Sequence, residues 1–363
     1  MRLLDDPLSL RRADPSDMLG RAAALPDQCV EGWERGLSWK VPRRHASLKQ
    51  VLVLGMGGSA IGADLLQGAV GECMERPVAV NRTYTLPGWV DRRTLVLACS
   101  YSGNTEETLS AAELARQAGA PVLAITSGGK LAAWARRHRF PLLQISAGLP
   151  PRSAVGYLTF APLGLFAGFG WVCERELGVE RACAGLRRYI ASSLASDVPT
   201  RLNPAKRLAA DLTGRLPVLY GAAGGWEGVT YRWRTQLEEN AKTLAFHHLF
   251  PEATHNEISA WLNPKGLMRN LAAVFLTDRA IHPRILRRME FVRRIVRAEG
   301  ARVRTVSAAG PTLLERMLRM IALGDFTSVY LGILYRVDPT PVERVEALKR
   351  FMRGRSILGH SGG

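Results

Sequence analysis

VLVLGMGGSAIG, residues 51–62, decides how the first half of the chain folds. Its run of apolar residues is typical of a strand buried on both faces, as in a parallel sheet covered by helices. Gly55, Gly57 and Gly58 follow directly and let the backbone turn sharply into a helix that begins near Ser59. Such a turn brings N–H groups and the positive end of a helix dipole toward an anion. The stretch therefore predicts a strand, an anion-binding turn and a helix.

A second turn of this kind occurs in LACSYSGNTEET, residues 97–108. Ser100, Ser102 and Thr105 surround a Gly-Asn turn between another apolar strand and another helix. Three hydroxyls beside a helix N-terminus suit a phosphate monoester, which accepts many hydrogen bonds. Thr105 could instead serve only as an N-cap. Because both turns belong to one predicted sheet, they favour a common phosphate site.

The glycine turn also fits the dinucleotide pattern G-x-G-x-x-A at Gly55, Gly57 and Ala60. A ribose-binding acid should then end the next strand, but Asn81 and Arg82 stand there. Arg82 could suit a 2′-phosphate, so this turn alone leaves an NADP-dependent oxidoreductase open. The second, hydroxyl-bearing turn weighs against that alternative.

Strands and helices alternate along the whole chain and predict an α/β fold. We expect two doubly wound parallel-sheet domains of the same architecture, with flanking N- and C-terminal helices. The predicted organisation is an N-terminal helical segment at 1–45, a phosphate-binding domain at 46–192, a second domain at 193–336, and a C-terminal helix and tail at 337–363.

Composition and cysteine spacing limit the cellular compartment and the cofactors that we expect for the protein. The chain has 363 residues, enough for two domains, and no uninterrupted run of about 18 apolar residues. Its first twelve residues lack the apolar region of a signal peptide. The five cysteines are scattered and never form C-x-x-C, which favours reduced thiols over disulfides or a zinc site. We therefore expect a cytoplasmic protein with no membrane partner, no cofactor and no metal.

The net charge of +17 comes mostly from arginines dispersed over segments with helical patterns. No basic tail and no alternation of basic and aromatic residues accompanies it. This pattern favours solvated helix faces and attraction for phosphorylated substrates, so we expect no nucleic-acid partner.

Two further stretches carry candidate catalytic groups. In LPPRSAVGY, residues 149–157, Arg152 lies between two prolines and a long apolar helix, where its guanidinium could hold a developing oxyanion. In YRWRTQLEENAK, residues 231–242, neighbouring Glu238 and Glu239 differ in direction by about 100°, so at most one should face a cleft between the domains. An isolated arginine or glutamate, however, more often belongs to the surface.

The segment FHHLFPEATHNEISAW, residues 246–261, is rich in histidine and is interpreted as irregular. Its histidines and glutamates could bind a metal, but they lack the helical H-x-x-x-H spacing that would support one. A single histidine opposite a carboxylate, in contrast, is a general acid–base arrangement.

Taken together, GMGGSAIG, SYSGNTEET, PPRSAVGY, QLEENAK and THNEISAW resemble the bifunctional phosphoglucose/phosphomannose isomerase family of sugar isomerase (SIS) domain proteins. The resemblance extends over residues 17–352. It implies a metal-independent isomerase that interconverts glucose 6-phosphate or mannose 6-phosphate with fructose 6-phosphate through a cis-enediolate. It also implies a homodimer with a shared active site, to which the second subunit could donate His255.

The resemblance also assigns roles to individual residues. Glu239 is the base, His255 assists ring opening, Arg152 lies beside the intermediate, and Lys349 lies on the last helix. Thr340 in DPTPV is a candidate for tolerance of both epimers. Phosphate binding falls to a set of turn residues, namely Gly57, Gly58, Ser59, Ser100, Ser102 and Thr105.

Two other functions of SIS domains remain open. A non-catalytic sensor of sugar phosphates would need the phosphate turns but neither Glu239 nor His255, and it usually carries a DNA-binding domain that the first 45 residues lack. An isomerase of amino sugars linked to a glutaminase would need an N-terminal domain with a catalytic cysteine.

Overall fold

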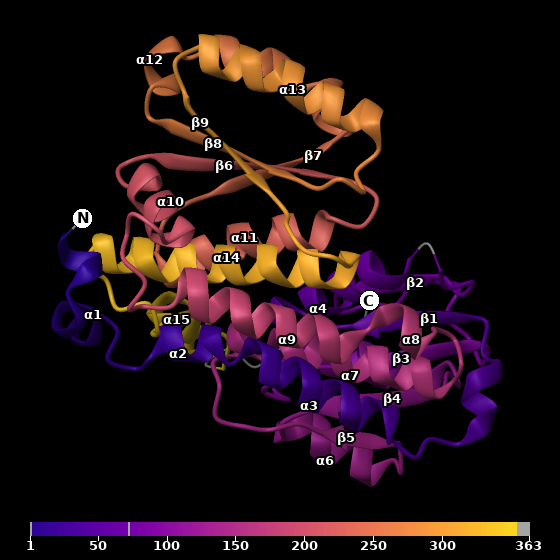
Figure 1. Cartoon of the computed structure of the whole chain (residues 1–363). Coiled ribbons are helices and arrows are strands. Elements are labelled where there is room, and N and C mark those ends of the chain that lie inside the picture. Colours follow the sequence, from indigo (N-terminus) through magenta and orange to yellow (C-terminus); the bar gives the residue numbers. More distant parts are fainter. Residues whose placement is uncertain (1, 72, 354–363) are drawn as a thin grey trace.

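A computed structural model describes residues 2–71 and 73–353, and two parallel sheets divide this part of the chain between them (Figure 1). The first sheet has the strand order β2-β1-β3-β4-β5 and the second has the order β7-β6-β8-β9. The two predicted doubly wound domains are thereby confirmed. Residues 354–363 of the predicted C-terminal tail lie outside the described residues.

The first sheet follows the predicted strands closely. Its strands are β1 Gln50–Leu54, β2 Val78–Asn81, β3 Thr94–Cys99, β4 Val122–Thr126 and β5 Leu142–Gln144. Along β1, Leu52 and Leu54 pack toward α5 and α6, whereas Val51 and Val53 pack toward α4 and α7. Both faces are apolar because successive side chains of a strand point to opposite faces and both faces are covered. The helices around this sheet are α4 Gly58–Val70, α5 Glu106–Gln117, α6 Gly129–Arg137 and α7 Val155–Gly168.

The remaining elements of the first half precede β1, lie directly before α7 or follow it. They are η1 Arg2–Asp5, α1 Pro7–Ala13, α2 Met18–Ala23, α3 Leu25–Leu37, η2 Arg43–Ser47, η3 Pro151–Ala154, α8 Glu174–Leu177, α9 Val179–Tyr189 and η4 Ile190–Leu194. Within the predicted N-terminal helical segment, the break between α2 and α3 comes at Ala24, and Pro26 occupies the first turn of α3.

The second sheet contains one strand that the sequence did not predict. β7 Phe246–Phe250 pairs with β6 in the segment interpreted as irregular, and that interpretation was wrong. β7 is a half-exposed edge strand with two histidines, so it lacks the apolar run that marks a central strand. The other elements of this half are α10 Pro204–Leu212, β6 Leu216–Ala222, α11 Glu227–Asn240, η5 Glu252–Thr254, η6 Glu257–Leu262, α12 Lys265–Met268, β8 Leu271–Thr277, α13 Pro283–Ala298, β9 Arg302–Ser307, α14 Leu313–Leu334 and α15 Glu343–Arg353.

α14 lies between the second sheet and the helices of the first half (Figure 1). It is long and apolar enough to cross a membrane by length and composition, yet 89% of its most apolar window is buried inside the described chain. This burial identifies α14 as a core helix that both halves share.

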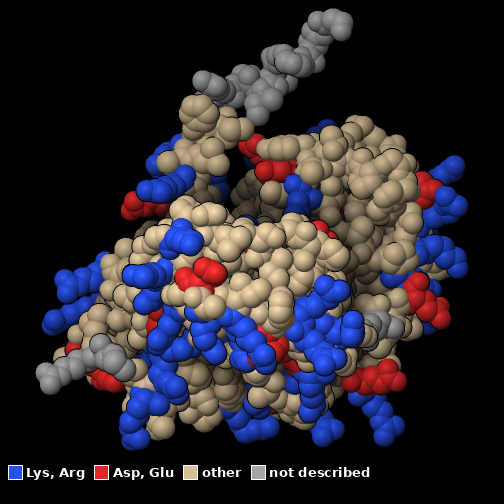
Figure 2. All heavy atoms as spheres, turned by 90° about the horizontal axis from the view of Figure 1, so that it is seen from above, with Lys and Arg blue, Asp and Glu red and all other residues tan. Residues whose placement is uncertain are grey.

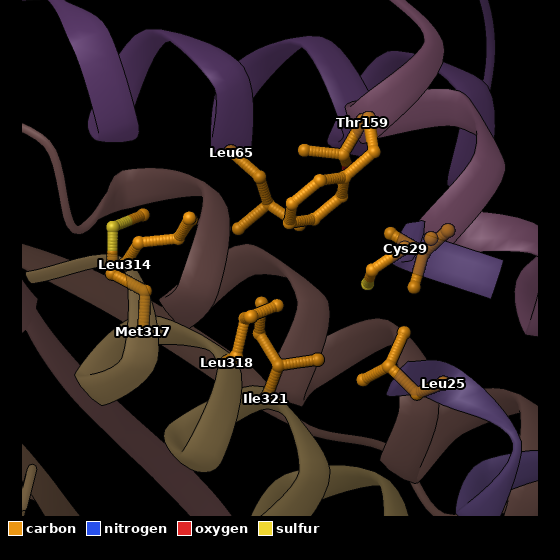
Figure 3. Close-up of a pocket in the computed structure, with 11 residues that line it drawn as sticks. Leu25, Cys29, Leu65, Thr159, Leu314, Met317, Leu318 and Ile321 are labelled. Carbon is orange, nitrogen blue, oxygen red and sulfur yellow. The ribbon is translucent and has the colours of Figure 1, made fainter. Parts of the chain in front are cut away.

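Side chains from four helices converge where the halves meet (Figure 3). Leu25 and Cys29 come from α3, Leu65 from α4 and Thr159 from α7, and they face α14. The space left between them is about 10 Å³, roughly the room for one water molecule. The contact is therefore a packed core rather than a ligand cavity.

Close helix packing in the first half depends on glycine. A Cβ added to Gly36 of α3 would lie 2.1 Å from the carbonyl oxygen of Ala161 in α7. The two backbones approach this closely only because the side chain is absent.

Basic side chains are spread over the visible surface with acidic ones among them (Figure 2). The largest basic helix is α13, which lies at the top of Figure 1 and so faces the viewer in Figure 2. Glu290 pairs there with Arg293 and Arg294, so part of this positive charge is neutralised on the helix itself.

Candidate active site

The two predicted anion-binding turns leave the first sheet side by side. Leu54 at the end of β1 is in register with Ala98 of β3, and the strand order reverses between these two strands. A crevice at the carboxyl ends of strands, at such a reversal, is the usual ligand site of an open α/β sheet. The predicted phosphate turns therefore occupy the position where this fold binds ligands.

Neither helix that follows these turns is capped by a side chain. α4 begins after Gly57, which has φ 50° and ψ −126°, a conformation that favours glycine. α5 begins after Thr105, whose hydroxyl makes no capping hydrogen bond. Helix N–H groups without a capping side chain are available to an anion.

The hydroxyls of the two turns are held by short local hydrogen bonds. Ser100 Oγ and Thr105 Oγ1 lie 2.8 Å apart, and Gly103 N donates to Ser100 Oγ at 3.1 Å. Ser59 Oγ accepts from Tyr101 N at 3.3 Å, which links the glycine turn to the hydroxyl-bearing turn. Ser102 is exposed, and its Oγ accepts from Asn104 N at 3.3 Å.

Arg152 lies on η3, which packs directly on the glycine turn. A Cβ added to Gly58 would lie 3.0 Å from Pro151 O, so glycine permits this approach. The structure thus brings the predicted arginine segment next to the predicted phosphate turn.

The Arg152 side chain is buried, with 3% of its surface exposed. Its Nε donates to Asn240 Oδ1 at 2.7 Å, and its Nη2 donates to the carbonyl oxygens of Pro339 at 2.7 Å and Thr340 at 2.8 Å. Its Nη1 lies 3.5 Å from Glu239 Oε2. Burial lowers the pKa of Arg152 and Glu239 counteracts this, but a guanidinium remains charged at any physiological pH. The Arg152 guanidinium therefore presents a fixed positive charge beside the Glu239 carboxylate.

The two glutamates of α11 face different partners. Glu239 faces Arg152 and keeps 36% of its side-chain surface exposed, whereas Glu238 lies 3.9 Å from Arg234. Burial raises the pKa of Glu238 and Arg234 opposes the rise. Of the two, only Glu239 joins the group around Arg152.

Lys242 also belongs to this group, at the end of α11. It adopts φ 54°, which is uncommon for a residue other than glycine. Its Nζ donates to the carbonyl oxygens of Glu239 at 2.5 Å and Pro339 at 3.1 Å. Lys242 and Arg152 thus bind the same Pro339 carbonyl and hold the segment before α15 against α11.

His255 and Lys349 are not bonded to the Arg152 group in the part of the chain that the structure describes. His255 is exposed at the end of η5, where its backbone N donates to Glu252 O. Lys349 on α15 donates to Glu346 Oε1 at 2.6 Å and is about half exposed. In the described ranges, no hydrogen bond or ion pair joins either side chain to Arg152 or Glu239.

The histidines of β7 do not assemble a metal site. Within residues 2–71 and 73–353, no group of three or more His, Cys, Asp or Glu side chains has metal-binding geometry. His247 instead packs against Tyr231, with ring centroids 5.5 Å apart. Burial, together with nearby Arg234, lowers the pKa of His247 to about 4.

The polar residues of α11 that lie behind Arg152 were not predicted as part of the site. Arg232, Gln236 and Asn240 occupy one face of α11 at intervals of four residues, and all three are buried. This regular spacing of polar residues was visible in the sequence. Their partners on α14 were not, because Asp325, which binds Arg232 and Gln236, and Ser328, which binds Asn240, lie far away in the chain.

Two doubly wound domains, with two predicted anion-binding turns at the strand-order reversal of the first sheet, are the arrangement expected of an SIS-domain protein. The SIS domain family matches residues 46–139, and the family described as the bacterial phospho-glucose isomerase C-terminal SIS domain matches residues 201–352. A crystal structure of a hypothetical protein from Thermus thermophilus superposes with a TM-score of 0.73 and 19% identity, over 95% of this chain and 92% of that one. At this identity, the likeness supports the fold alone.

Proteins of similar sequence indicate which family of SIS-domain proteins the chain belongs to. The bifunctional phosphoglucose/phosphomannose isomerase of Caldicellulosiruptor bescii is 39% identical over 325 residues, which are 90% of this chain and 96% of that protein. The protein of the same name from Thermoplasma acidophilum is 34% identical over 85% of this chain and 91% of its own length. The chain therefore belongs to the bifunctional phosphoglucose/phosphomannose isomerase family, whose members are intramolecular oxidoreductases.

Proposed function

We propose that this protein interconverts glucose 6-phosphate and mannose 6-phosphate with fructose 6-phosphate, without a metal or redox cofactor. One observation carries the proposal: Arg152 Nη1 lies 3.5 Å from Glu239 Oε2, next to the two anion-binding turns. A base, a fixed cation and a phosphate site are the parts that an aldose–ketose isomerisation requires. The names of the relatives support this choice of substrates.

The phosphate of the substrate binds at the two turns in this proposal. The N–H groups of Gly57 and Gly58 and the hydroxyls of the serines and threonine surround it, so that the sugar extends toward Arg152. The set of hydroxyl ligands is Ser59, Ser100, Ser102 and Thr105. Because Gly58 packs against the backbone of Pro151 and Arg152, the arginine segment borders the glycine turn.

The chemistry then proceeds by proton transfers alone. His255, with Lys349 or an ordered water, moves a proton from the anomeric hydroxyl to the ring oxygen and opens the pyranose. Glu239 removes the proton from C2 of the open aldose and returns it to C1, through a cis-enediolate. Arg152 stabilises the negative oxygen of this intermediate. Glu239 keeps 36% of its side-chain surface exposed, which leaves its carboxylate accessible to the substrate.

Glucose and mannose 6-phosphates differ only in configuration at C2, and loss of the C2 proton gives both the same enediolate. A site that allows rotation about the C2–C3 bond can return the proton to either face. Thr340 is a candidate for this tolerance, because its carbonyl binds Arg152 and the residue therefore borders the site.

We also propose that the protein acts as a homodimer whose partner supplies His255. His255 is exposed, and in the described ranges no hydrogen bond or ion pair joins it to Arg152 or Glu239 of its own chain, which supports its donation to a second subunit. A two-fold dimer in which each subunit donates one histidine builds two equivalent sites.

The test of the activity is a coupled assay for fructose 6-phosphate with glucose 6-phosphate and mannose 6-phosphate offered separately. We expect turnover of both sugars that survives EDTA and disappears in Glu239→Gln. Glu238→Gln is the matched control and should retain activity. Turnover of neither sugar would favour the non-catalytic sensor, and turnover of glucosamine 6-phosphate alone would favour an amino-sugar isomerase.

The shared site has a separate test by subunit complementation. Glu239→Gln and His255→Asn are each expected to be inactive and are mixed under conditions that exchange subunits. With His255 in trans, each mixed dimer regains one intact site, so activity should rise to roughly one quarter of wild type for random pairing. With His255 in cis, no site is intact and no activity returns.

A further inference from the structure

A buried ion pair lies behind the candidate active site, between α11 and α14. Arg232 Nε and Nη2 bind the Asp325 carboxylate at 3.0 and 2.7 Å, and the two side chains are 2% and 5% exposed. Gln236 Nε2 donates to the same carboxylate at 3.0 Å. Burial raises the pKa of Asp325, and the charge of Arg232 opposes the rise.

The same arginine also binds the backbone of the candidate oxyanion residue. Arg232 Nη1 and Nη2 each donate to the carbonyl oxygen of Arg152 at 3.1 Å. The guanidinium therefore connects Asp325, in the middle of α14, to η3, where Arg152 lies. Arg152 is thus held at its main chain by Arg232.

A second connection holds the Arg152 side chain from the same two helices. Asn240 Oδ1 accepts from Arg152 Nε at 2.7 Å, and Asn240 Nδ2 donates to Ser328 Oγ at 2.9 Å. Ser328 Oγ in turn donates to the Asp325 carbonyl oxygen at 2.7 Å. One turn of α14 therefore binds both Arg232, which holds the Arg152 backbone, and Asn240, which holds the Arg152 guanidinium.

A contribution to the stability of the fold does not by itself explain why Arg232 and Asp325 form a buried ion pair. The desolvation of two charges largely offsets their attraction, so apolar residues of similar size often stabilise a core equally well. Apolar residues, however, could not donate to the Arg152 carbonyl. Polar contacts of this kind can hold a donor such as Arg152 rigidly in place for the transition state. Rigid placement matters because a small displacement from the productive geometry lowers the reaction rate by a large factor.

We propose that Arg232 and Asp325 are positioning residues that hold Arg152 at the place where the enediolate oxygen forms. This inference rests on the proposed function and names residues that act through Arg152 without touching the substrate. The pair acts on stabilisation of the intermediate and leaves binding of the phosphate end unaffected.

The experiment compares wild type with Asp325→Asn and Arg232→Lys. Asparagine keeps the shape of residue 325 and removes its charge, whereas lysine keeps the charge of residue 232 and loses the fork that reaches both partners. We expect kcat to fall at least about tenfold in each variant while KM changes less than about threefold, since only the transition state loses a contact.

Two inhibitors, one sugar-acid phosphate and one sugar-alcohol phosphate, distinguish a role in positioning Arg152 from a role in protein stability alone. One inhibitor is the five-carbon aldonate 5-phosphate, whose carboxylate imitates the enediolate, and the other is the six-carbon alditol 6-phosphate, which has no carbonyl. In the variants, the inhibition constant of the aldonate should rise at least about tenfold, and that of the alditol should stay within about threefold. A purely structural role would reduce the fraction of active protein and leave the ratio of the two constants unchanged.

The chain contains a matched control pair. Arg316 and Asp278 form an equally buried ion pair at 2.6 and 3.2 Å, and neither side chain bonds to Arg152 or Glu239. Asp278→Asn should leave kcat and the inhibitor ratio as in wild type, whatever it does to the melting temperature.

Each result of these experiments either supports or overturns the positioning role of Arg232 and Asp325. An unchanged inhibitor ratio in folded Asp325→Asn and Arg232→Lys overturns it, as does loss of the fold in both while Asp278→Asn still folds. Wild-type protein that turns over neither sugar phosphate refutes the proposed function instead, and that result is visible before any variant is made.

Discussion

Replacement of Arg152 by lysine tests the centre of the site. In the structure its guanidinium reaches three neutral acceptors on two sides, Asn240 Oδ1 and the carbonyl oxygens of Pro339 and Thr340, at 2.7 to 2.8 Å. A lysine ammonium is a single point and cannot serve both sides together.

The expected cost follows from these contacts. Loss of two hydrogen bonds to a charged donor, each worth about 1.5 kcal/mol or more, lowers the free energy of unfolding by about 3 kcal/mol. For a chain of 363 residues that unfolds as one unit, this corresponds to a fall in Tm of about 4 °C. Activity should fall more steeply, by about 10²- to 10³-fold in kcat, because a donor aimed at the developing oxyanion is displaced.

The assay measures kcat for both sugar phosphates beside thermal unfolding of the same preparation. Arg234→Lys is the control, because Arg234 lies 3.9 Å from Glu238 and both side chains are partly exposed, so its stability should change by less than about 0.5 kcal/mol. A variant Arg152→Lys with a lowered Tm but wild-type kcat would refute the reasoning, since Arg152 would then serve the structure alone.

Three further predictions concern pH, packing and phosphate binding. His247, with a folded pKa of about 4 against about 6.5 when unfolded, stabilises the fold fully above pH 6.5 and loses that contribution as pH falls toward 4. His247→Asn should therefore flatten the pH dependence of stability in that window, by at most about 1.4 kcal/mol per pH unit, as urea titrations at several pH values would reveal. Gly36→Ala forces a Cβ against α7 and should cost more than about 1 kcal/mol, whereas Gly88→Ala, with open space around it, should cost little; equal melting temperatures would contradict the packing argument. Ser102→Ala, which removes an exposed hydroxyl, should raise KM about tenfold for both sugar phosphates without changing Tm, and an unchanged KM would remove Ser102 from the phosphate site.

The fold was predictable wherever burial leaves a clear pattern. β1 and β3 are buried along nearly their whole length, so their residues are apolar without interruption and the glycines and hydroxyls that follow stand out. β7, in contrast, has no uninterrupted apolar run, because it is an edge strand with partly exposed histidines. Its sequence therefore shows no pattern that predicts a strand. Its existence depends on pairing with β6, which only the folded chain supplies.

By itself, the sequence determined local geometry at this candidate site: where strands end, where glycines permit a turn, and which helix bears the glutamates. These features depend on neighbouring residues, so residue type and spacing are sufficient to predict them. Tertiary structure decided which glutamate faces Arg152 and which groups hold that arginine. Two of its hydrogen-bond acceptors, the carbonyl oxygens of Pro339 and Thr340, lie 187 and 188 residues away in the chain. Contacts of that separation arise from the packing of two domains around α14, and no local pattern encodes them.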